Sequence, residues 1–156
     1  MTRGTATLID ATGRLVVHPI ETDGADGIRK LLGCQRFEAA HRFDNGDVLF
    51  VDEEGFVKPC DAFFSLAMRP DQPFAGNGVV LGRHAGDGVP TRPPRTTATE
   101  LEAMVTFKDR AATRAQLRGK PHATMTHYAD DGTTVTEVLS WWDDVLAEAE
   151  GHLRRP

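Results

Sequence analysis

Short runs of β-branched and other apolar residues, separated by polar turns, make up the first part of the chain. Residues 5–9 and 14–20 are two such runs, and the turn between them ends at Gly13. Two strand-like runs joined by a short turn that contains glycine predict a β-hairpin. Pro19 has no amide hydrogen to donate to a sheet, so we expect the second strand to end there.

The strongest turn signal is the Asn45-Gly46 pair, which lies between apolar runs at residues 36–43 and 48–51. Asn-Gly readily adopts the positive φ angles of a type I′ turn, so this segment predicts a second hairpin. The polar residues 52–55 then turn the chain again before Phe56. We therefore expect the strands to continue as an antiparallel meander.

Three more segments are short and mainly apolar. Residues 26–33 have apolar positions at helical spacing and end at Gly33, so they predict one small helix. Residues 62–68 are apolar almost throughout, and Pro70 prevents a helix from continuing, so we expect a buried turn or a short helix. Residues 79–81 are bounded by glycines and predict a small strand.

Helical signals follow residue 96. Thr97 and Glu100 have the spacing of a capping box, in which each side chain pairs with a free amide at the start of a helix. Thr134 and Glu137 repeat this spacing, and apolar residues then recur at helical intervals over residues 138–153. We therefore expect a C-terminal helix there, with a short strand before it.

These elements predict an α+β fold, in which a twisted, mainly antiparallel sheet carries short helices on one face. We expect residues 1–107 to form this α+β domain. Residues 108–156 would add a C-terminal helical extension. We expect the extension to pack on the same domain, because a chain of 156 residues is too short for two large independent cores.

Composition narrows the class of protein. The chain is 40% hydrophobic and 26% charged, which is typical of a globular domain. No apolar run approaches the roughly 20 residues of a membrane-spanning helix, and residues 1–9 lack the pattern of a secretory signal. We therefore expect a cytoplasmic location and no membrane. Cys34 and Cys60 stand apart in the sequence, so we expect reduced thiols. Cys34 also follows a predicted helix end, where the helix dipole disfavours a nucleophilic thiolate.

The net charge of -5 is unevenly distributed. Residues 92–120 hold seven basic and three acidic side chains, whereas residues 121–156 hold two basic and seven acidic ones. The basic segment could meet an anionic partner. Nucleic acid is an unfavoured partner for the whole chain, because domains dedicated to binding it are usually strongly basic.

The order of motifs in the first two thirds of the chain resembles the domain-of-unknown-function family 3846, which occurs in actinobacteria, their phages and other mobile elements. The resemblance covers about residues 5–107 and rests on the motifs LLGC (residues 31–34), VDEEG (residues 51–55) and GNGVVLG (residues 76–82). The family implies an α+β architecture and a mobile-element setting, but no known chemistry. Where the family usually has an asparagine after the VDEEG strand, this chain has Asp61.

No group of side chains has the spacing of a catalytic or metal site. Asp52, Glu53 and Glu54 form the densest acidic cluster, but neighbouring residues on a strand point to opposite faces, and polar trios beside a glycine are typical of solvated turns. His122 and His127 are the closest histidines, whereas zinc requires three or four converging ligands. We expect no catalytic residue, no metal and no cofactor, with a metal-dependent hydrolase as an alternative.

A basic stripe is spaced at four-residue intervals along a predicted helix over residues 107–118, and it consists of Arg110, Arg114 and Arg118. One interpretation is an ordinary solvated helix face. The other is a docking stripe for an acidic partner, or for the acidic C-terminal helix of a second copy.

Trp141 and Trp142 are adjacent, so one can enter the core while the other points away from it. An exposed tryptophan is a frequent binding hot spot. Packing against Tyr128 or against the linker at residues 86–96 is the competing interpretation. With Val145 and Leu146, the two tryptophans and the arginine stripe are the candidate partner-binding residues.

Residues 86–96 are rich in glycine and proline and predict an exposed loop. Four side chains around this loop could clamp a phosphate if it folded over a ligand, namely Arg83, His84, Arg92 and Arg95. We expect a non-catalytic accessory protein of a phage or mobile element, which binds a host protein or itself. The alternative is a protein that binds or sequesters an anionic nucleotide.

Overall fold

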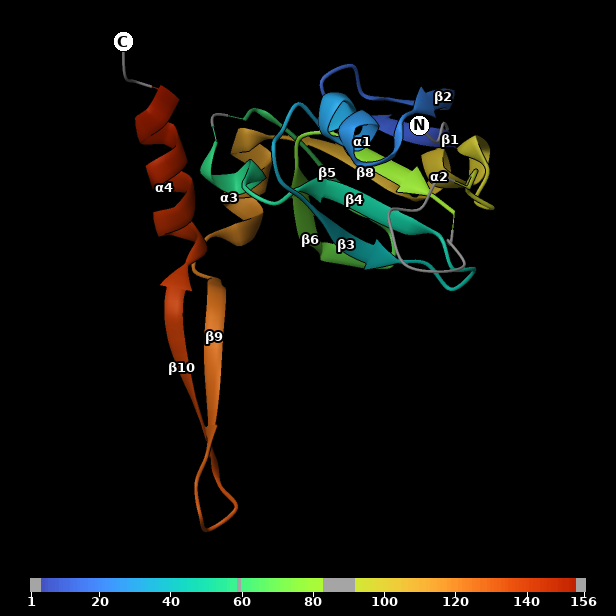
Figure 1. Ribbon diagram of the computed structural model, residues 1–156. Coiled ribbons are helices and arrows are strands. Elements are labelled where there is room, and N and C mark those ends of the chain that lie inside the picture. Colours follow the sequence, from blue (N-terminus) through green and yellow to red (C-terminus); the bar gives the residue numbers. More distant parts are fainter. Residues whose placement is uncertain (1–3, 59, 83–91, 154–156) are drawn as a thin grey trace.

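The computed structural model describes residues 4–58, 60–82 and 92–153 (Figure 1). Within these residues the protein has an α+β fold of antiparallel sheets and four α-helices, one of which lies at the C-terminal end. This is the fold class that the sequence predicts.

The larger sheet has five strands in the order β2-β1-β7-β4-β3, and all neighbours are antiparallel. Its strands are β1 (Gly4–Asp10), β2 (Leu15–Thr22), β3 (Phe37–Arg42), β4 (Val48–Asp52) and β7 (Gly78–Leu81). Both predicted hairpins, β1–β2 and β3–β4, are present. The predicted type I′ turn at Asn45-Gly46 was wrong, because Gly46 has a positive φ (94°) but Asn45 does not. The prediction that the second strand ends at Pro19 was wrong, because β2 continues to Thr22. This strand is at an edge of the sheet, where a missing amide hydrogen breaks no ladder.

A second sheet, which we call the smaller sheet, has three strands in the order β6-β5-β8. Its strands are β5 (Ala62–Leu66), β6 (Arg69–Ala75) and β8 (Val105–Asp109). The prediction of a buried turn or short helix at residues 62–68 was wrong. Phe63 and Phe64 are both buried, on opposite faces of β5, and an apolar run of this length does not distinguish a strand from a helix. Residues Gly55–Val57 form a 3-10 turn, η1, in place of the strand expected at Phe56. The expected meander was therefore wrong, because β4 lies between β3 and β7 and the next strand, β5, belongs to another sheet.

The core lies on both faces of the larger sheet. Along β4, Leu49 and Val51 point into one apolar cluster and Val48 and Phe50 into another, as the alternation of a strand requires. Helix α1 (Gly24–Leu32) packs on the second cluster and ends at the left-handed Gly33, as predicted. Helix α2 (Ala98–Met104) and the smaller sheet pack on the first. The two helices therefore cover opposite faces of the sheet, and the prediction that the short helices lie on one face was wrong.

The last third of the chain differs most from expectation. It contains α3 (Arg110–Leu117), β9 (Pro121–Tyr128), β10 (Thr134–Trp141) and α4 (Trp142–Leu153). The capping box at Thr97 and Glu100 is confirmed at the start of α2. The capping box predicted at Thr134 and Glu137 is wrong, because these two residues lie within β10, opposite Tyr128 and Met125 of β9.

Candidate functional site

The clearest candidate for a binding surface is the hairpin formed by β9 and β10, which we call the arm (residues 121–141). Figure 1 shows the arm extending away from the two sheets, with its turn far from the rest of the protein. The carbonyl of Lys120 accepts a hydrogen bond of 3.1 Å from the amide of Trp142. The chain therefore enters and leaves the arm at one point, beside α3 and α4.

The arm exposes apolar side chains and strand edges together. Six large apolar side chains on it are between 40% and 81% exposed, namely Met125, Tyr128, Val135, Val138, Leu139 and Trp141. Within the described residues, β9 and β10 pair only with each other, so each strand has an outer edge with free backbone donors and acceptors. Such an edge can accept an extended segment of another chain.

The charged side chains of the arm and α4 are acidic. Residues 121–153 contain seven carboxylates and no lysine or arginine. On one face of the arm, Nε2 of His127 lies 3.2 Å from Oε2 of Glu137. On the other face, the hydroxyls of Thr126 and Thr136 are 3.3 Å apart across the two strands. The arm therefore combines apolar side chains with negative charge.

The two tryptophans diverge, as their adjacency predicts. Trp141 is 43% exposed at the base of the arm, whereas Trp142 is buried and its ring centroid lies 4.6 Å from that of Phe56. Leu146 is fully buried beside Trp142, and Val145 is partly buried against the same cluster. Trp142, Val145 and Leu146 therefore hold α4 on the body of the protein, and Trp141 alone of the four predicted contacts is largely exposed.

The three arginines do not form one stripe. Arg110, at the start of α3, donates a hydrogen bond to the carbonyl of Cys60. Arg114 instead faces α4, where its guanidinium binds the carboxylate of Glu150. Arg118 follows the end of α3 and is exposed. The acidic helix that meets this segment thus belongs to the same chain.

The predicted phosphate clamp is described only in part. Arg83 and His84 lie outside the described residues. Arg92 and Arg95 have exposed side chains, and their backbones are held in place. The carbonyl of Arg92 accepts a hydrogen bond from the amide of Gly82, and the amide of Arg95 donates one to the buried carboxylate of Asp47.

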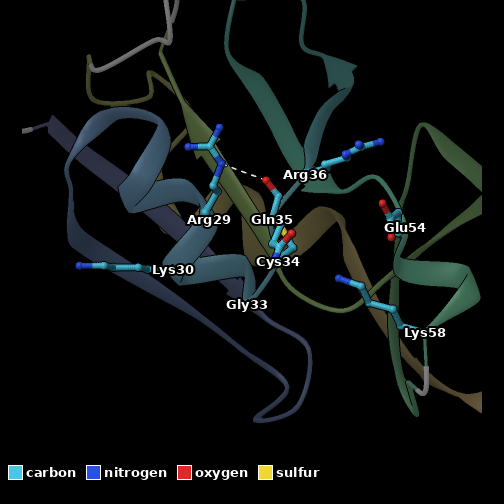
Figure 2. Close-up of a pocket in the computed structure, with 8 residues that line it drawn as sticks. All are labelled: Arg29, Lys30, Gly33, Cys34, Gln35, Arg36, Glu54 and Lys58. Carbon is cyan, nitrogen blue, oxygen red and sulfur yellow. Dashed lines mark hydrogen bonds between the residues drawn. The ribbon is translucent and has the colours of Figure 1, made fainter.

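A second candidate, which the sequence reasoning missed, is a hollow of about 520 Å³ between the end of α1 and the segment that follows η1. We call it the basic pocket, because four cationic side chains line it, namely Arg29, Lys30, Arg36 and Lys58. Figure 2 shows Arg29 and Lys30 on one side, and Arg36 and Lys58 on the other. Glu54 is the one carboxylate among the lining residues.

Two of these cations are held by fixed partners. Nε of Arg29 donates to the carbonyl of Gln35, and its Nη1 donates to Asp26, each at 2.9 Å. Nζ of Lys58 lies 2.9 Å from Oδ2 of Asp52. This hydrogen bond raises the pKa of Lys58, so the ammonium stays charged at neutral pH.

Cys34 lies between the two pairs of cations (Figure 2). Burial raises the pKa of its thiol, and the negative charge of Asp52 raises it further, which outweighs the nearby Lys58. The thiol is therefore protonated and a poor nucleophile at neutral pH. The expectation of an unreactive Cys34 agrees with this pKa, although its main physical cause is burial.

Comparison of the chain with protein-family models, with curated proteins and with solved structures finds no match. The resemblance to the domain-of-unknown-function family 3846 therefore stays a prediction. Among the described residues, no three or more His, Cys, Asp and Glu side chains gather where they could hold a metal ion. No helix within that part of the chain is long and apolar enough to cross a membrane.

Proposed function

We propose that this protein acts without catalysis, by binding another protein chain through the arm. The partner is a host protein or a second copy of the protein. The observation that carries the proposal is the exposure of the arm: six of its large apolar side chains are at least 40% exposed, and within the described residues its two strands pair only with each other.

Physical reasons favour a partner for such an element. A hairpin of two strands is marginally stable alone in water, so a long exposed hairpin gains stability when a third strand or a second apolar face covers it. Trp141 and Tyr128 are the residue types that most often dominate binding energy at interfaces. Backbone hydrogen bonds along an open strand edge would add affinity, and the exposed side chains would add specificity.

The cellular setting is part of the proposal. The resemblance of residues 5–107 suggests an accessory protein of a phage or other mobile element. Cys34 and Cys60 are both free thiols, which supports a cytoplasmic location, because thiols remain reduced there.

Removal of the arm tests the proposal. Because Lys120 and Trp142 are hydrogen-bonded at the base of the arm, two glycines can replace residues 121–141 without displacing α4. We expect the intact protein to form a dimer by light scattering or to capture a defined partner from host lysate. The variant without the arm should remain folded by circular dichroism and lose that association.

Point variants provide a matched comparison. Leu139→Ser and Trp141→Ser remove exposed apolar groups from the arm and should weaken the association. Met68→Ser removes an equally exposed apolar side chain from the body and should leave it unchanged. An association that survives both the loss of the arm and these two arm substitutions would show that the binding surface lies elsewhere.

A further inference from the structure

The basic pocket concentrates positive charge at a site remote from the arm in sequence. Its four cations come from three separate segments, namely the last turn of α1, the loop before β3 and the residues after η1. Glu54 is the one carboxylate that lines the hollow, and Asp26 and Asp52 lie beside it, paired with Arg29 and Lys58, so the four cations exceed the neighbouring carboxylates by one charge. A surface that gathers four cations around a concave site favours a negatively charged occupant.

The pocket is partly organised before any ligand binds. The guanidinium of Arg29 is fixed by Gln35 and Asp26, and the ammonium of Lys58 is fixed by Asp52. These bonds use two of the five N–H donors of Arg29 and one of the three of Lys58, so both cations retain donors for a ligand. Side chains that are already held lose less conformational entropy when a ligand binds.

The placement of the cations also selects the kind of anion. Arg29 and Lys30 lie on one side of the pocket and Arg36 and Lys58 on the other, with Cys34 between them (Figure 2). In this view the ammonium of Lys58 points toward Cys34, whereas the exposed side chains of Lys30 and Arg36 extend outward and would turn inward on a ligand. A chain of two or three phosphates carries charge at several points and therefore matches cations on two sides of a pocket better than a single small anion does. The volume of about 520 Å³ is within the usual range for small-molecule sites.

We propose that the basic pocket binds a polyphosphate-bearing small molecule, of the class of pyrophosphate and nucleoside di- or triphosphates. Arg29 and Lys30 would contact one end of the phosphate chain, and Arg36 and Lys58 the other. This binding is non-covalent. It is independent of the arm, and it places anion recognition at the end of α1 in place of the loop at residues 83–95.

Thermal shift and calorimetry with pyrophosphate, ATP and inorganic phosphate test the proposal at matched ionic strength. We expect pyrophosphate and ATP to raise the melting temperature, and inorganic phosphate to have a much smaller effect, because it contacts one side only. Tighter binding of ATP than of pyrophosphate would show that the nucleoside is also recognised. Equal affinity would assign recognition to the phosphate chain alone.

Two double variants separate the pocket from general surface charge. Lys30→Gln with Arg36→Gln removes one exposed cation from each side and should weaken pyrophosphate binding about tenfold or more. Arg42→Gln with Arg118→Gln removes the same charge from exposed positions that do not line the pocket. This second variant should bind pyrophosphate as the unmodified protein does. An equal loss in both would overturn the proposal.

Cys34 supplies a direct measure of occupancy. A bound polyphosphate should slow the reaction of Cys34 with N-ethylmaleimide, followed at about pH 9 where part of this thiol is ionised, because Cys34 lines the pocket. Cys60 is an internal control, since it does not line the pocket and should react at an unchanged rate. If millimolar pyrophosphate neither shifts the melting temperature nor protects Cys34, the pocket does not bind this class of ligand.

Discussion

Arg114 of α3 and Glu150 of α4 form a two-point ion pair, in which Nε of the arginine lies 2.8 Å from Oε1 of the glutamate. An arginine on this segment was expected to be solvated or to meet an acidic partner, such as the C-terminal helix of a second copy. In the structure the C-terminal helix of the same chain occupies that position. The pair therefore helps to hold α4 beside the base of the arm.

Arg114→Gln should lower the free energy of unfolding by about 1 kcal/mol, since the pair is bidentate but its side chains are still about a quarter to a third exposed. Urea denaturation of Arg114→Gln, Glu150→Gln and the double variant measures the coupling between the two residues. Arg118→Gln is the control and should have no effect. Strictly additive single effects would mean that the pair contributes nothing.

Trp142→Ala should destabilise the protein far more than Trp141→Ala. Trp142 is buried among Phe56 and Leu146, and removal of a buried tryptophan typically costs about 3–5 kcal/mol. Trp141 is 43% exposed, so its replacement should cost clearly less, about 1–2 kcal/mol. Thermal unfolding of the two variants compares them directly, and similar losses in both would contradict the burial described here.

Asp47 should be important for stability although it lies in a turn. Its buried carboxylate accepts hydrogen bonds from the amides of Arg95 (3.0 Å) and Thr96 (2.7 Å), which join the β3–β4 turn to the start of α2. Asp47→Ala would leave these amides without an acceptor and should cost about 2–3 kcal/mol.

Chemical denaturation measures this cost, and hydrogen exchange at the amide of Thr96 reports the local effect. Asp44→Ala, at an exposed position in the same turn, is the matched control and should change little. If the two substitutions had equal effects, the carboxylate of Asp47 would have no special role.

The stability of the protein should depend on pH through His41. Burial, and then the positive charge of Arg69, lower the pKa of His41 below its usual value of 6.5. The folded state therefore binds fewer protons than the unfolded state as the pH falls below 6.5. The contribution of neutral His41 to the free energy of unfolding is therefore fully present above pH 6.5. This contribution is lost as the pH falls below 6.5 and through the lower pKa of the folded state.

Urea denaturation at several pH values between 5 and 7 tests this dependence. The free energy of unfolding should fall more steeply toward low pH in the unmodified protein than in His41→Gln, which cannot titrate in this range. Parallel pH profiles would mean that His41 titrates alike in the folded and unfolded states.

Elements with a local chemical signal were predictable from the sequence. The Asn45-Gly46 turn, the C-terminal Gly33 of α1 and the capping box of α2 depend on residues only a few positions apart. Elements with ambiguous local signals were not predictable from the sequence. Thr134 and Glu137 have the spacing of a capping box, but the same residues suit a strand, and pairing with β9 decides between the two. Strand β6 was not predicted because it contains Pro70 and Pro73. It tolerates these prolines because it lies at the edge of its sheet, where a missing amide hydrogen breaks no ladder.

The candidate sites divide in the same way. The adjacency of Trp141 and Trp142 determined that their side chains would diverge, because consecutive residues cannot share one direction. Which of them is buried depends on Phe56, about 85 positions earlier in the chain, and so only the tertiary structure decides it. Likewise, Arg29, Arg36 and Lys58 have no common motif, and they line one pocket because folding brings the end of α1 beside the segment after η1.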